Sequence, residues 1–592
     1  MKFSRFAKYL LELESTTKRL EITEILSRLI KEFSQEETEK GVYLSLGQLG
    51  PLFDRVDFAI ADKMMLRVFS KSYGEDEATI KKLFDDLGDL GKIANELAGK
   101  HKTKDAGLTV LEVYDSLLKI AKLAGQGSQE KKVADFASLL QKLDKLSAKF
   151  IVRIPVGNTR LGFSDVTVIE ALSWMAKGDK SLKSAIENYF HRYPDIGKVA
   201  SLFKKGGLKA LEQVGLEVGV PVLPQLCQRV GTFEEAIEKL GGKAGSEFKF
   251  DGTRVQLHMD KGRMISPSES QLTFFESNKK VPFVKTFTRN LEETTHMFPD
   301  IVRSAIDSID AKSVIVDGEA VGIDPKTGNM LPFQETSQRK RKNQILEKIS
   351  EIPLKYFVFD ILYLNGKELL DKPFSERREI LKSVIKTTDK ILVDDQKLIT
   401  NSSELSAEFK KAKDNGLEGV VVKKLTSPYE AGGRGFSWIK IKREETGGLE
   451  DTIDAVILGY YFGKGARTKF GIGGFLVGTF DKEKDHFVTL SKVGSGPTEA
   501  EWELIKKKVD AIKVKEKPAN YEVSKTLLCD VWAKPEIVVV IRADEITVSD
   551  AHTAGFALRF PRLMDFRADK DPRDTTSVDE VKHLYELQGK KV

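Results

Sequence analysis

The chain has 592 residues, 41% of them hydrophobic and 31% charged, a composition typical of soluble globular proteins with several domains. Lys and Arg number 95 against 89 Asp and Glu, so a generally polybasic protein is excluded and any nucleic-acid surface must arise from local clustering. The two cysteines, Cys227 and Cys529, cannot supply a disulfide framework or a four-cysteine metal site. The sequence has no recognisable signal peptide and no long apolar stretch, so we expect an intracellular, cytoplasmic protein without a membrane partner.

The N-terminal third has the pattern of helices. Hydrophobic residues recur at helical spacing, first at Phe3, Phe6, Leu10 and Leu13 and again between residues 22 and 30. Polar, glycine-containing stretches such as 124–129 and 157–162 separate the segments. We predict an all-α domain over residues 1–218.

The pattern changes near residue 220, where short β-rich runs begin to alternate with amphipathic helices. This alternation predicts an α+β domain over residues 219–445. The runs expected as strands are 247–258, 313–321, 356–364, 419–423 and 438–442. Beyond 446 the runs 455–461, 474–480, 486–490 and 537–541 predict a small β-barrel with little helix, a third domain over residues 446–592.

The sharpest chemical signal is Glu-Phe-Lys-Phe-Asp-Gly-Thr-Arg at 247–254. On a strand Glu247 and Lys249 share one face, and Gly252 permits a tight turn that returns Arg254 to the same pocket. A lysine is a nucleophile only when neutral, so we expect burial and nearby cations to lower the pKa of Lys249 from about 10.4. The alternative is an exposed strand end without chemistry.

Four further segments place charged or aromatic side chains in the same domain. They supply Asp317 and Glu319, expected at a turn; Phe357 and Phe359, suited to stacking on a base; Glu418 and Lys423 at the two ends of an apolar strand; and Trp438, Lys440 and Lys442 on one strand face. Taken singly, each is more often structural. Together they indicate nucleotidyl transfer through a lysine, without a P-loop.

In this order, the five segments resemble motifs I, III, IIIa, IV and V of the covalent nucleotidyltransferases. Residues 287–292 resemble motif Ia, and residues 557–562 with 567–570 resemble motif VI. The set resembles the ATP-dependent DNA ligases over nearly the whole chain, particularly the archaeal and eukaryotic replicative type. The stretch between Arg254 and Arg289 is longer than is usual in that family, and we interpret it as a surface insertion that lengthens a hairpin.

The resemblance implies a helical DNA-binding domain, an α+β adenylation domain and a β-barrel OB-fold domain. It implies that Lys249 attacks the α-phosphate of ATP, that the AMP passes to the 5′-phosphate of a DNA nick, and that the 3′-hydroxyl then displaces it. Such an enzyme seals nicked double-stranded DNA in replication, repair and recombination. We expect a monomer with a sliding clamp as a candidate partner, associated with the nucleoid when bound to DNA.

The resemblance also implies roles for individual residues. Glu247 would contact the adenine amino group, Phe359 (or Phe357) would stack on the base, and Glu319 would hold the ribose. Lys423 and Lys440 would contact the α-phosphate, and Arg562 and Lys570 the leaving pyrophosphate. Arg254 and Arg289 would hold the sugar or the nick phosphate, and Arg434 is a further nucleotide-binding residue. Glu319 and Glu418 would hold Mg²⁺, with Mn²⁺ as the alternative metal. Lys442 would contact either the α-phosphate or DNA. The DNA-binding residues would be Gly125, Gly127, Ser128, Arg160 and Gly162 in the helical domain and Lys464 and Arg467 in the third domain.

Several alternatives stay open. An RNA ligase or capping enzyme would lack the helical domain, an NAD-dependent DNA ligase would need four cysteines for zinc, and a non-catalytic DNA clamp would not need the lysine and its acids. ADP or GTP could replace ATP. The basic cluster 339–342 is either a solvated loop or a DNA contact, residues 443–448 are a candidate hinge, and His258 and His552 are expected to be structural.

Overall fold

A computed structural model describes the chain up to residue 587, apart from residues 17, 158, 160, 231, 268–274, 276–278, 337–338, 340–348, 443–451, 464–470 and 495. The chain divides into two compact units, Met1–Thr159 with Ser164–Lys442 and Arg160–Phe163 with Arg443–Val592. Each unit is described by itself. The predicted domain boundaries at 218/219 and 445/446 stay predictions.

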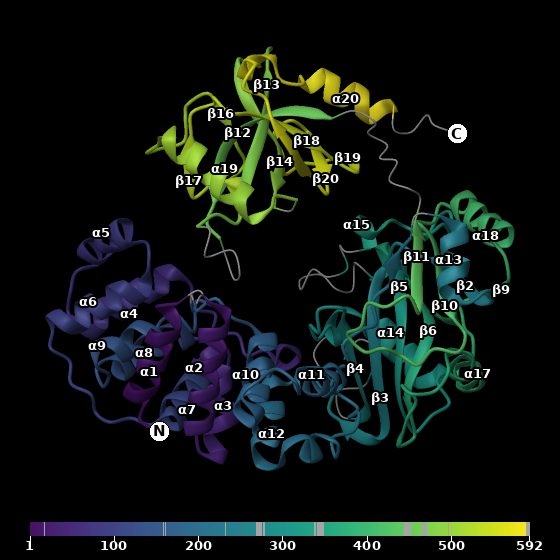
Figure 1. Ribbon diagram of the computed structural model, residues 1–592, viewed down its shortest axis with the longest axis horizontal. Helices are drawn as coiled ribbons and strands as arrows, with labels where there is room; N and C mark the ends of the chain where they lie inside the picture. The colour runs from purple at the N-terminus through teal and green to yellow at the C-terminus, as the bar shows by residue number, and fades with distance from the viewer. Residues whose placement is uncertain are drawn as a thin grey trace. The chain divides into compact units, whose positions relative to one another are not determined.

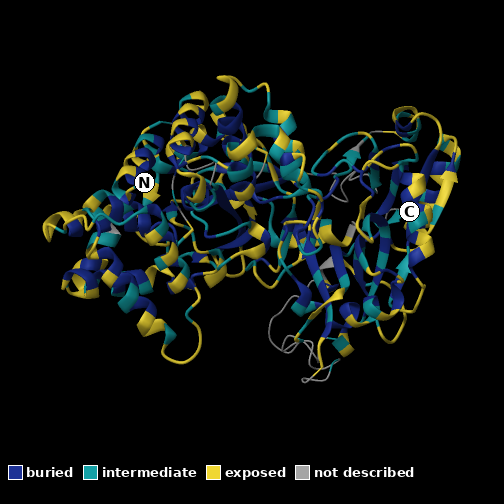
Figure 2. Ribbon diagram, turned by 90° about the horizontal axis from the view of Figure 1, so that it is seen from below, coloured by how far each residue is buried: buried dark blue, intermediate teal, exposed yellow. Residues whose placement is uncertain are grey.

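The first part of the larger unit is helical throughout the residues that the structure describes (Figure 1). Its helices are α1 (Phe3–Glu14), α2 (Arg19–Glu32), α3 (Gln35–Leu46), α4 (Asp62–Tyr73), α5 (Glu77–Leu87), α6 (Leu90–Lys100), α7 (Val110–Ala121), α8 (Ser128–Leu140), α9 (Lys145–Ile151), α10 (Asp165–Lys177), α11 (Lys183–Arg192) and α12 (Ile196–Leu211). The residues predicted from helical spacing, such as Phe3 and Leu13, are buried, and exposed turns surround the dark interior in Figure 2. The all-α prediction is confirmed.

A five-stranded sheet with the strand order β1-β11-β10-β2-β9 lies in the second part of this unit. Its elements are β1 (Gln228–Arg229), α13 (Phe233–Leu240), β2 (Ala244–Lys249), β9 (Gln396–Ile399), α18 (Ser402–Asp414), β10 (Gly419–Lys424) and β11 (Trp438–Lys442). In β11 apolar side chains alternate with Lys440 and Lys442, and Val420, Val422 and Ile439 are buried in a cluster with residues of α13 and α18. The opposite, polar face is therefore left for the candidate site.

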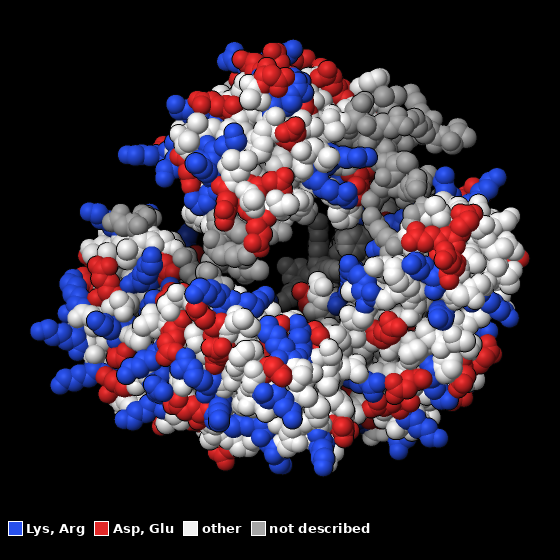
Figure 3. All heavy atoms as spheres, viewed as in Figure 1, with Lys and Arg blue, Asp and Glu red and all other residues white. Residues whose placement is uncertain are grey.

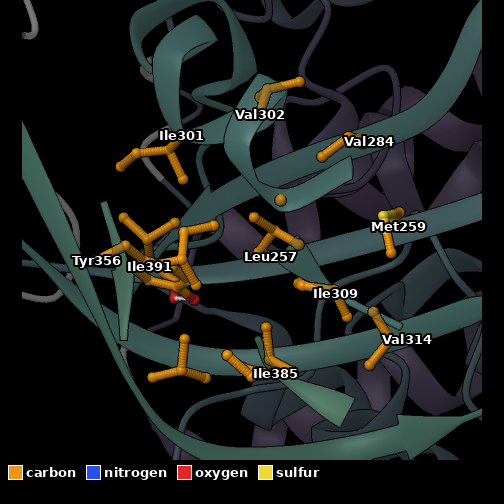
Figure 4. Packing of buried hydrophobic residues seen from close by; sticks show 14 of the residues in the cluster. Leu257, Met259, Val284, Ile301, Val302, Ile309, Val314, Tyr356, Ile385 and Ile391 are labelled. Carbon is orange, nitrogen blue, oxygen red and sulfur yellow. Dashed lines mark hydrogen bonds between the residues drawn. The ribbon is translucent and has the colours of Figure 1, made fainter. Parts of the chain in front are cut away.

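A six-stranded sheet with the order β4-β3-β5-β6-β7 follows, and β8 pairs with β6. Its elements are β3 (Thr253–Ile265), β4 (Val281–Thr288), α14 (Pro299–Ser308), β5 (Ser313–Gly322), α15 (Phe333–Thr336), β6 (Leu354–Leu364), β7 (Lys367–Glu368), α17 (Phe374–Val384) and β8 (Ile391–Val393). One face, including Leu257, Met259 and Val314, packs with Ile301 and Val302 of α14 into a single apolar cluster (Figure 4). Each such buried side chain contributes roughly 1.5–3 kcal/mol to folding.

Residues 250–252 carry the chain from the five-stranded to the six-stranded sheet, so the expected strand 247–258 is in fact two strands. The backbone of Gly252 does not adopt positive φ. An added Cβ there would lie 2.5 Å from the carbonyl oxygen of Ala320. The chain does bend at residues 251–252, but glycine is required there for the close approach to β5 and not for a positive φ.

A second correction concerns Asp317 and Glu319, which were expected at a turn. Both lie within β5, which continues to Gly322, and Arg254 of β3 is the register partner of Glu319. The two acids are two residues apart on a strand, so their side chains project from the same face. The hairpin expected between Arg254 and Arg289 is confirmed by the antiparallel pairing of β3 with β4. Most of the stretch at its tip lies outside the described residues.

The smaller unit is rich in strands, as predicted. Its elements are β12 (Ile453–Tyr461), β13 (Gly474–Asp481), β14 (His486–Val493), α19 (Glu499–Ala511), β15 (Lys513–Val514), β16 (Tyr521–Glu522), β17 (Val531–Ala533), β18 (Val538–Arg542), β19 (Glu545–Val548), β20 (Phe556–Arg559), β21 (Arg562–Phe566) and α20 (Val578–Leu587). The helices α19 and α20 were not predicted from the sequence. Thr498 and Glu501 form a capping box at the start of α19, a signal by which that helix could have been predicted.

Candidate active site

The polar face of the five-stranded sheet gathers three of the predicted segments. In the sheet, Gly419 of β10 lies opposite Lys249 of β2 on one side and Lys442 of β11 on the other. Val421 of β10 likewise lies between Glu247 of β2 and Lys440 of β11. Two-residue alternation then places Glu247, Lys249, Lys440 and Lys442 on one face. The sequence predicted each pair separately, and the pairing of β2, β10 and β11 brings them together.

Lys249 forms an ion pair with Glu418, whose backbone N–H also donates to the carbonyl of Lys249 at 3.2 Å. The side chains of Lys249 and Glu418 are 23% and 21% exposed, so the pair is accessible. Burial alone would lower the pKa of Lys249, but the charge and hydrogen bond of Glu418 and the charge of Glu319 outweigh it and raise the pKa above its usual value. The expectation of a lowered pKa is therefore wrong, because the dominant neighbours are carboxylates.

Two carboxylates flank the lysine from different sheets. Burial raises the pKa of Glu319 on β5 to about 7, against the opposing charges of Lys249 and Arg254. The pKa of Glu418 is instead lowered, because Lys249 and Lys442 outweigh its burial, and the Nζ of Lys442 lies 3.6 Å from its carboxylate. Oxygen ligands of this kind suit Mg²⁺, which usually takes one or two carboxylates together with substrate phosphates. Among the described residues no group of three or more His, Cys, Asp or Glu side chains is arranged to hold a metal ion.

Arg254 of β3 is held firmly by its neighbours. It makes two hydrogen bonds with Asp317, at 2.6 and 3.1 Å, and donates to the carbonyl of Gln225 and to the hydroxyl of Tyr429. Tyr429 in turn donates to Asp317 at 2.9 Å. The carboxylate of Asp317 raises the pKa of Arg254, against the effect of burial, and so keeps it charged. Sequence reasoning missed Gln225 and Tyr429, which no local pattern connects with Arg254.

Glu247 and Lys423 meet at the other end of the five-stranded sheet. Their side chains are 2% and 1% exposed and their charged atoms are 2.5 Å apart. Lys423 pairs in register with Gly245, four residues from Lys249, and its ammonium lies over the rings of Phe359, Phe374 and Trp438. Gly245 and Lys249 are thus about 13 Å apart along β2, and the predicted role of Lys423 at the α-phosphate stays a prediction.

The two candidate stacking rings have different neighbours. Phe357 is stacked on Phe250, with ring centroids 4.2 Å apart, and belongs to the core behind the five-stranded sheet. Phe359 lies edge-on to Trp438 at 5.9 Å, and the guanidinium of Arg254 lies 5.4 Å from its ring. Both rings are packed against apolar clusters, Phe357 behind the five-stranded sheet and Phe359 against Trp438, so which of them stacks on the base stays a prediction.

Two predicted arginines lie at the margin of the site. Arg289 directly follows β4, is exposed, and lines a small cavity together with Arg254 and Asp317. Arg434 is exposed on the loop between β10 and β11. Both are placed where a substrate could reach them.

The motif VI cations lie in the smaller unit, each paired with an acid. Lys570 and Arg567 contact Asp454 at 2.6 and 3.3 Å, and Arg562, 48% exposed, contacts Asp544 at 3.2 Å. The pair of Arg562 with Asp544 is exposed and therefore weak, so this cation can exchange partners, whereas the contacts with Asp454 are partly buried.

The predicted DNA-binding glycines lie in exposed loops and have positive φ. Gly125 and Gly127, before Ser128 at the start of α8, have φ of 86° and 76°, and Gly162 has 71°. Their exposed loops leave backbone N–H groups available to phosphates. Arg160, Lys464 and Arg467 lie outside the described residues, as does the candidate hinge at 443–448. In Figure 3, basic and acidic side chains are interspersed over the viewed face, in keeping with the small net charge.

Three further predictions concern buried groups. Arg339 of the basic cluster is buried against Asp300 at 2.6 Å, so at this residue both the solvated-loop and the DNA-contact alternatives are wrong. His258 is buried and accepts a hydrogen bond from the N–H of Gly219, and His552 contacts Ser549, so the structural assignment fits both. Burial lowers the pKa of His258 to about 3.

Comparison with known proteins agrees with this geometry. The model of the ATP dependent DNA ligase domain matches residues 224–442, that of the DNA ligase N terminus matches 2–173, and that of the ATP dependent DNA ligase C terminal region matches 468–570. The chain belongs to the ATP-dependent DNA ligase family. It is thus an enzyme that joins DNA strands by forming phosphodiester bonds, with ATP as the nucleotide.

Full-length relatives support the same assignment. The ligase is 42% identical to a probable DNA ligase of Dictyoglomus turgidum over 100% of this chain and 98% of that protein. It is 37% identical to a DNA ligase of Pyrobaculum islandicum and 35% identical to one of Sulfolobus acidocaldarius, over 100% of this chain and 99% of each relative. The solved structure Pmar-Lig_PreS3 shares the fold at a TM-score of 0.52 and 16% identity, covering 95% of this chain and 99% of that one. In the described part of the ligase, every helix is too short or too polar to cross a membrane.

Proposed function

We propose that Lys249 is the nucleophile that carries AMP and that the residues around it act in the first chemical step. The Nζ of Lys249 would attack the α-phosphorus of ATP to form a P–N bond, the bond from that phosphorus to the β-phosphate oxygen would break, and pyrophosphate would leave. The observation that carries this proposal is the accessible pair of Lys249 with Glu418, facing Glu319 of the other sheet. Before it attacks, Lys249 must exchange the carboxylate of Glu418 for the phosphate and release a proton to water.

The neighbouring side chains would bind and orient the nucleotide. Lys440 and Lys442 share the face of Lys249 and would hold the α-phosphate, whereas the buried Lys423 would support the base end. Phe359 would stack on the adenine, Glu247 would accept a hydrogen bond from its amino group, and Arg254 would fix the wall between base and ribose. Arg289 and Arg434 would contact the sugar or the nick phosphate.

We further propose that Glu319 and Glu418 hold Mg²⁺ jointly with the phosphates. The ion would supply positive charge that offsets the charge developing on the phosphorus oxygens. Glu319 would also hold the ribose hydroxyls, and its raised pKa reflects the low-dielectric wall on which it sits. Labelling of the protein should therefore stop in EDTA and return with Mg²⁺ or Mn²⁺.

The second and third steps would use nicked double-stranded DNA as the partner of a monomer. The AMP would pass from Lys249 to the 5′-phosphate, and the 3′-hydroxyl would displace it. The loops with Gly125, Gly127 and Gly162 would contact the backbone, together with Arg160, Lys464 and Arg467, while Arg562 and Lys570 would leave Asp544 and Asp454 for the pyrophosphate in the first step. Light scattering with and without nicked DNA tests the monomer, and a binding assay tests the sliding clamp as a partner.

The decisive experiment is label transfer from α-³²P-ATP to the full chain in Mg²⁺, followed by a chase with nicked DNA. Label that appears on the wild type and is lost to DNA supports the proposal. The matched control is Lys249→Arg, which keeps a cation beside Glu418 but cannot form a stable phosphoramidate intermediate. This variant should bind nicked DNA but take no label. Label on Lys249→Arg, or label from GTP or NAD⁺ in preference to ATP, would overturn the assignment.

A further inference from the structure

The carboxylate of Glu247 is held by three donors from three different elements. One oxygen accepts from the Nη1 of Arg378 at 3.1 Å and from the amide of Gln396 at 2.9 Å, and the other pairs with Lys423. The side chains of Arg378 and Glu247 are 5% and 2% exposed. An ionised carboxylate has about four acceptor positions, so three donors leave about one for a further hydrogen bond.

Arg378 differs from the other two donors because it also holds the neighbouring chain. Its Nη2 donates to the carbonyl of Asp394, at the start of the short segment that carries Gln396. Asp394 is itself buried, and one of its carboxylate oxygens has no hydrogen-bond partner. Burial and the charge of Glu247 raise the pKa of Asp394. A single guanidinium on α17 thus fixes both Glu247 and the segment beside it.

The adjacent residue provides a natural comparison on the same helix. Arg377 is fully buried and makes two hydrogen bonds with Asp360, at 2.7 and 2.9 Å. Its other donors go to the carbonyls of Lys372 and Ser427. Arg377 and Arg378 therefore have the same chemistry and similar burial, but only Arg378 contacts Glu247.

We propose that Arg378 is a positioning residue that fixes the remaining acceptor position of Glu247 and so sets the preference of this ligase for a base with a 6-amino group. The inference rests on the proposed role of Glu247 in recognising adenine. Adenine donates from this position, guanine presents an oxygen there, and purine presents neither. A fixed acceptor on Glu247 favours the amino group of adenine. With guanine or purine the buried carboxylate oxygen would have no donor, and this cost is the physical basis of strong discrimination between the bases.

The test compares ATP with purine riboside 5′-triphosphate, which lacks only the amino group, in the labelling of Lys249. We expect Arg378→Met to raise the KM for ATP and to lower the ratio of kcat/KM values for the two nucleotides by about tenfold or more. Arg378→Lys, which keeps the charge but not the paired geometry, should restore part of the ratio. Gln396→Leu should lower the ratio less, since it removes one neutral donor.

Arg377→Lys is the matched control and should keep the wild-type ratio even if it lowers the melting temperature. An equal loss of ratio in Arg377→Lys and Arg378→Lys would overturn the inference, because it would reflect general loosening. If Arg378→Met does not fold, the two lysine variants and Gln396→Leu decide the question. Glu247→Gln separates the inference about Arg378 from the proposed role of Glu247. If Glu247→Gln loses the preference for ATP and the Arg378 variants keep it, the inference about Arg378 is wrong and the role of Glu247 stands. If Glu247→Gln keeps the preference while Lys249 is still labelled, the role of Glu247 falls and the nucleophile stands.

Discussion

The two sheets that form the site differ in how firmly their charges are held. On the five-stranded sheet, Lys249 and Lys442 are each more than one-fifth exposed and share a single carboxylate, Glu418. On the six-stranded sheet, Asp317 is 1% exposed and makes two hydrogen bonds with Arg254. The charges around Glu418 on the first sheet can thus exchange partners, whereas Asp317 and Arg254 on the second cannot. The first sheet also has a fixed pair, Glu247 with Lys423, but that pair is buried. A reaction in which a lysine must release its partner and accept a phosphate requires this division.

The largest difference in stability between the two sheets is expected when one charge is removed from each. Asp317→Asn leaves the guanidinium of Arg254 buried without its counter-ion, and we expect a loss of about 3–5 kcal/mol in the free energy of unfolding. Lys249→Ala removes a partly exposed pair and should cost about 1 kcal/mol or less. Urea denaturation measures both. Equal losses would show that the two sheets are not held differently.

A second test uses a buried group of the six-stranded sheet whose pKa differs between folded and unfolded protein. His258 has a folded pKa of about 3, below the unfolded value of about 6.5, so its contribution to stability is fully present above pH 6.5 and is lost as the pH falls toward 3. The Nδ1 of His258 accepts from Gly219, so Nε2 carries the proton and donates to Gln256, and protonation of Nδ1 would break the first bond.

Between the unfolded pKa of about 6.5 and the folded pKa of about 3, protonation of His258 should lower the free energy of unfolding by about 1.4 kcal/mol for each unit by which the pH falls. The measurement is the difference in pH dependence of the unfolding free energy between the wild type and His258→Gln. Parallel curves for the two proteins would contradict the buried neutral histidine.

The same comparison of the two sheets explains which parts of the site could be predicted from the sequence. On the five-stranded sheet the functional residues alternate along short segments, so Glu247 with Lys249 and Lys440 with Lys442 could be identified from period-two spacing. The α, mixed and strand-rich order of regions was also predictable, because it depends on local patterns. On the six-stranded sheet the partners of Arg254 come from residues 225, 317 and 429, and no local pattern connects them.

The errors have the same origin. The sequence showed cations near Lys249 but not that Glu418 and Glu319 would be its dominant neighbours, so the direction of its pKa shift was predicted wrongly. Lys423 follows Glu418 by five residues, and only the structure shows that it pairs with Glu247. Arg378 belongs to no predicted motif, although it contacts the most sharply predicted segment. Contacts across sheets decide the electrostatics, and spacing along the chain does not contain them.

A third prediction concerns the backbone that holds the exchangeable pair. Gly419 has φ of 147°, and an added Cβ would lie 2.1 Å from the carbonyl oxygen of Ile441, so Gly419→Ala must force β10 away from β11. We expect a loss on the order of 1–3 kcal/mol in the free energy of unfolding. We also expect slower labelling by ATP, because Glu418 precedes this glycine and is fixed by it beside Lys249. Gly241→Ala is the control: this C-cap glycine also has positive φ, but its added Cβ would meet no neighbour within 4 Å. It should lose stability without a comparable loss of labelling.

The smallest effect on stability and the finest test of the comparison come from Lys442. Its 3.6 Å contact with Glu418 is partly exposed and contributes at most about 1 kcal/mol, so Lys442→Met should fold like the wild type. If Lys442 holds the α-phosphate, labelling by ATP without DNA should slow by roughly ten- to a hundredfold. If it contacts DNA instead, labelling should be unchanged and the sealing of a pre-adenylated nick should slow and become more sensitive to salt. A large loss of stability in this variant would contradict the view that the charges around Glu418 are free to exchange partners, since a cation that must leave a carboxylate for a phosphate in every cycle cannot also be required for the fold.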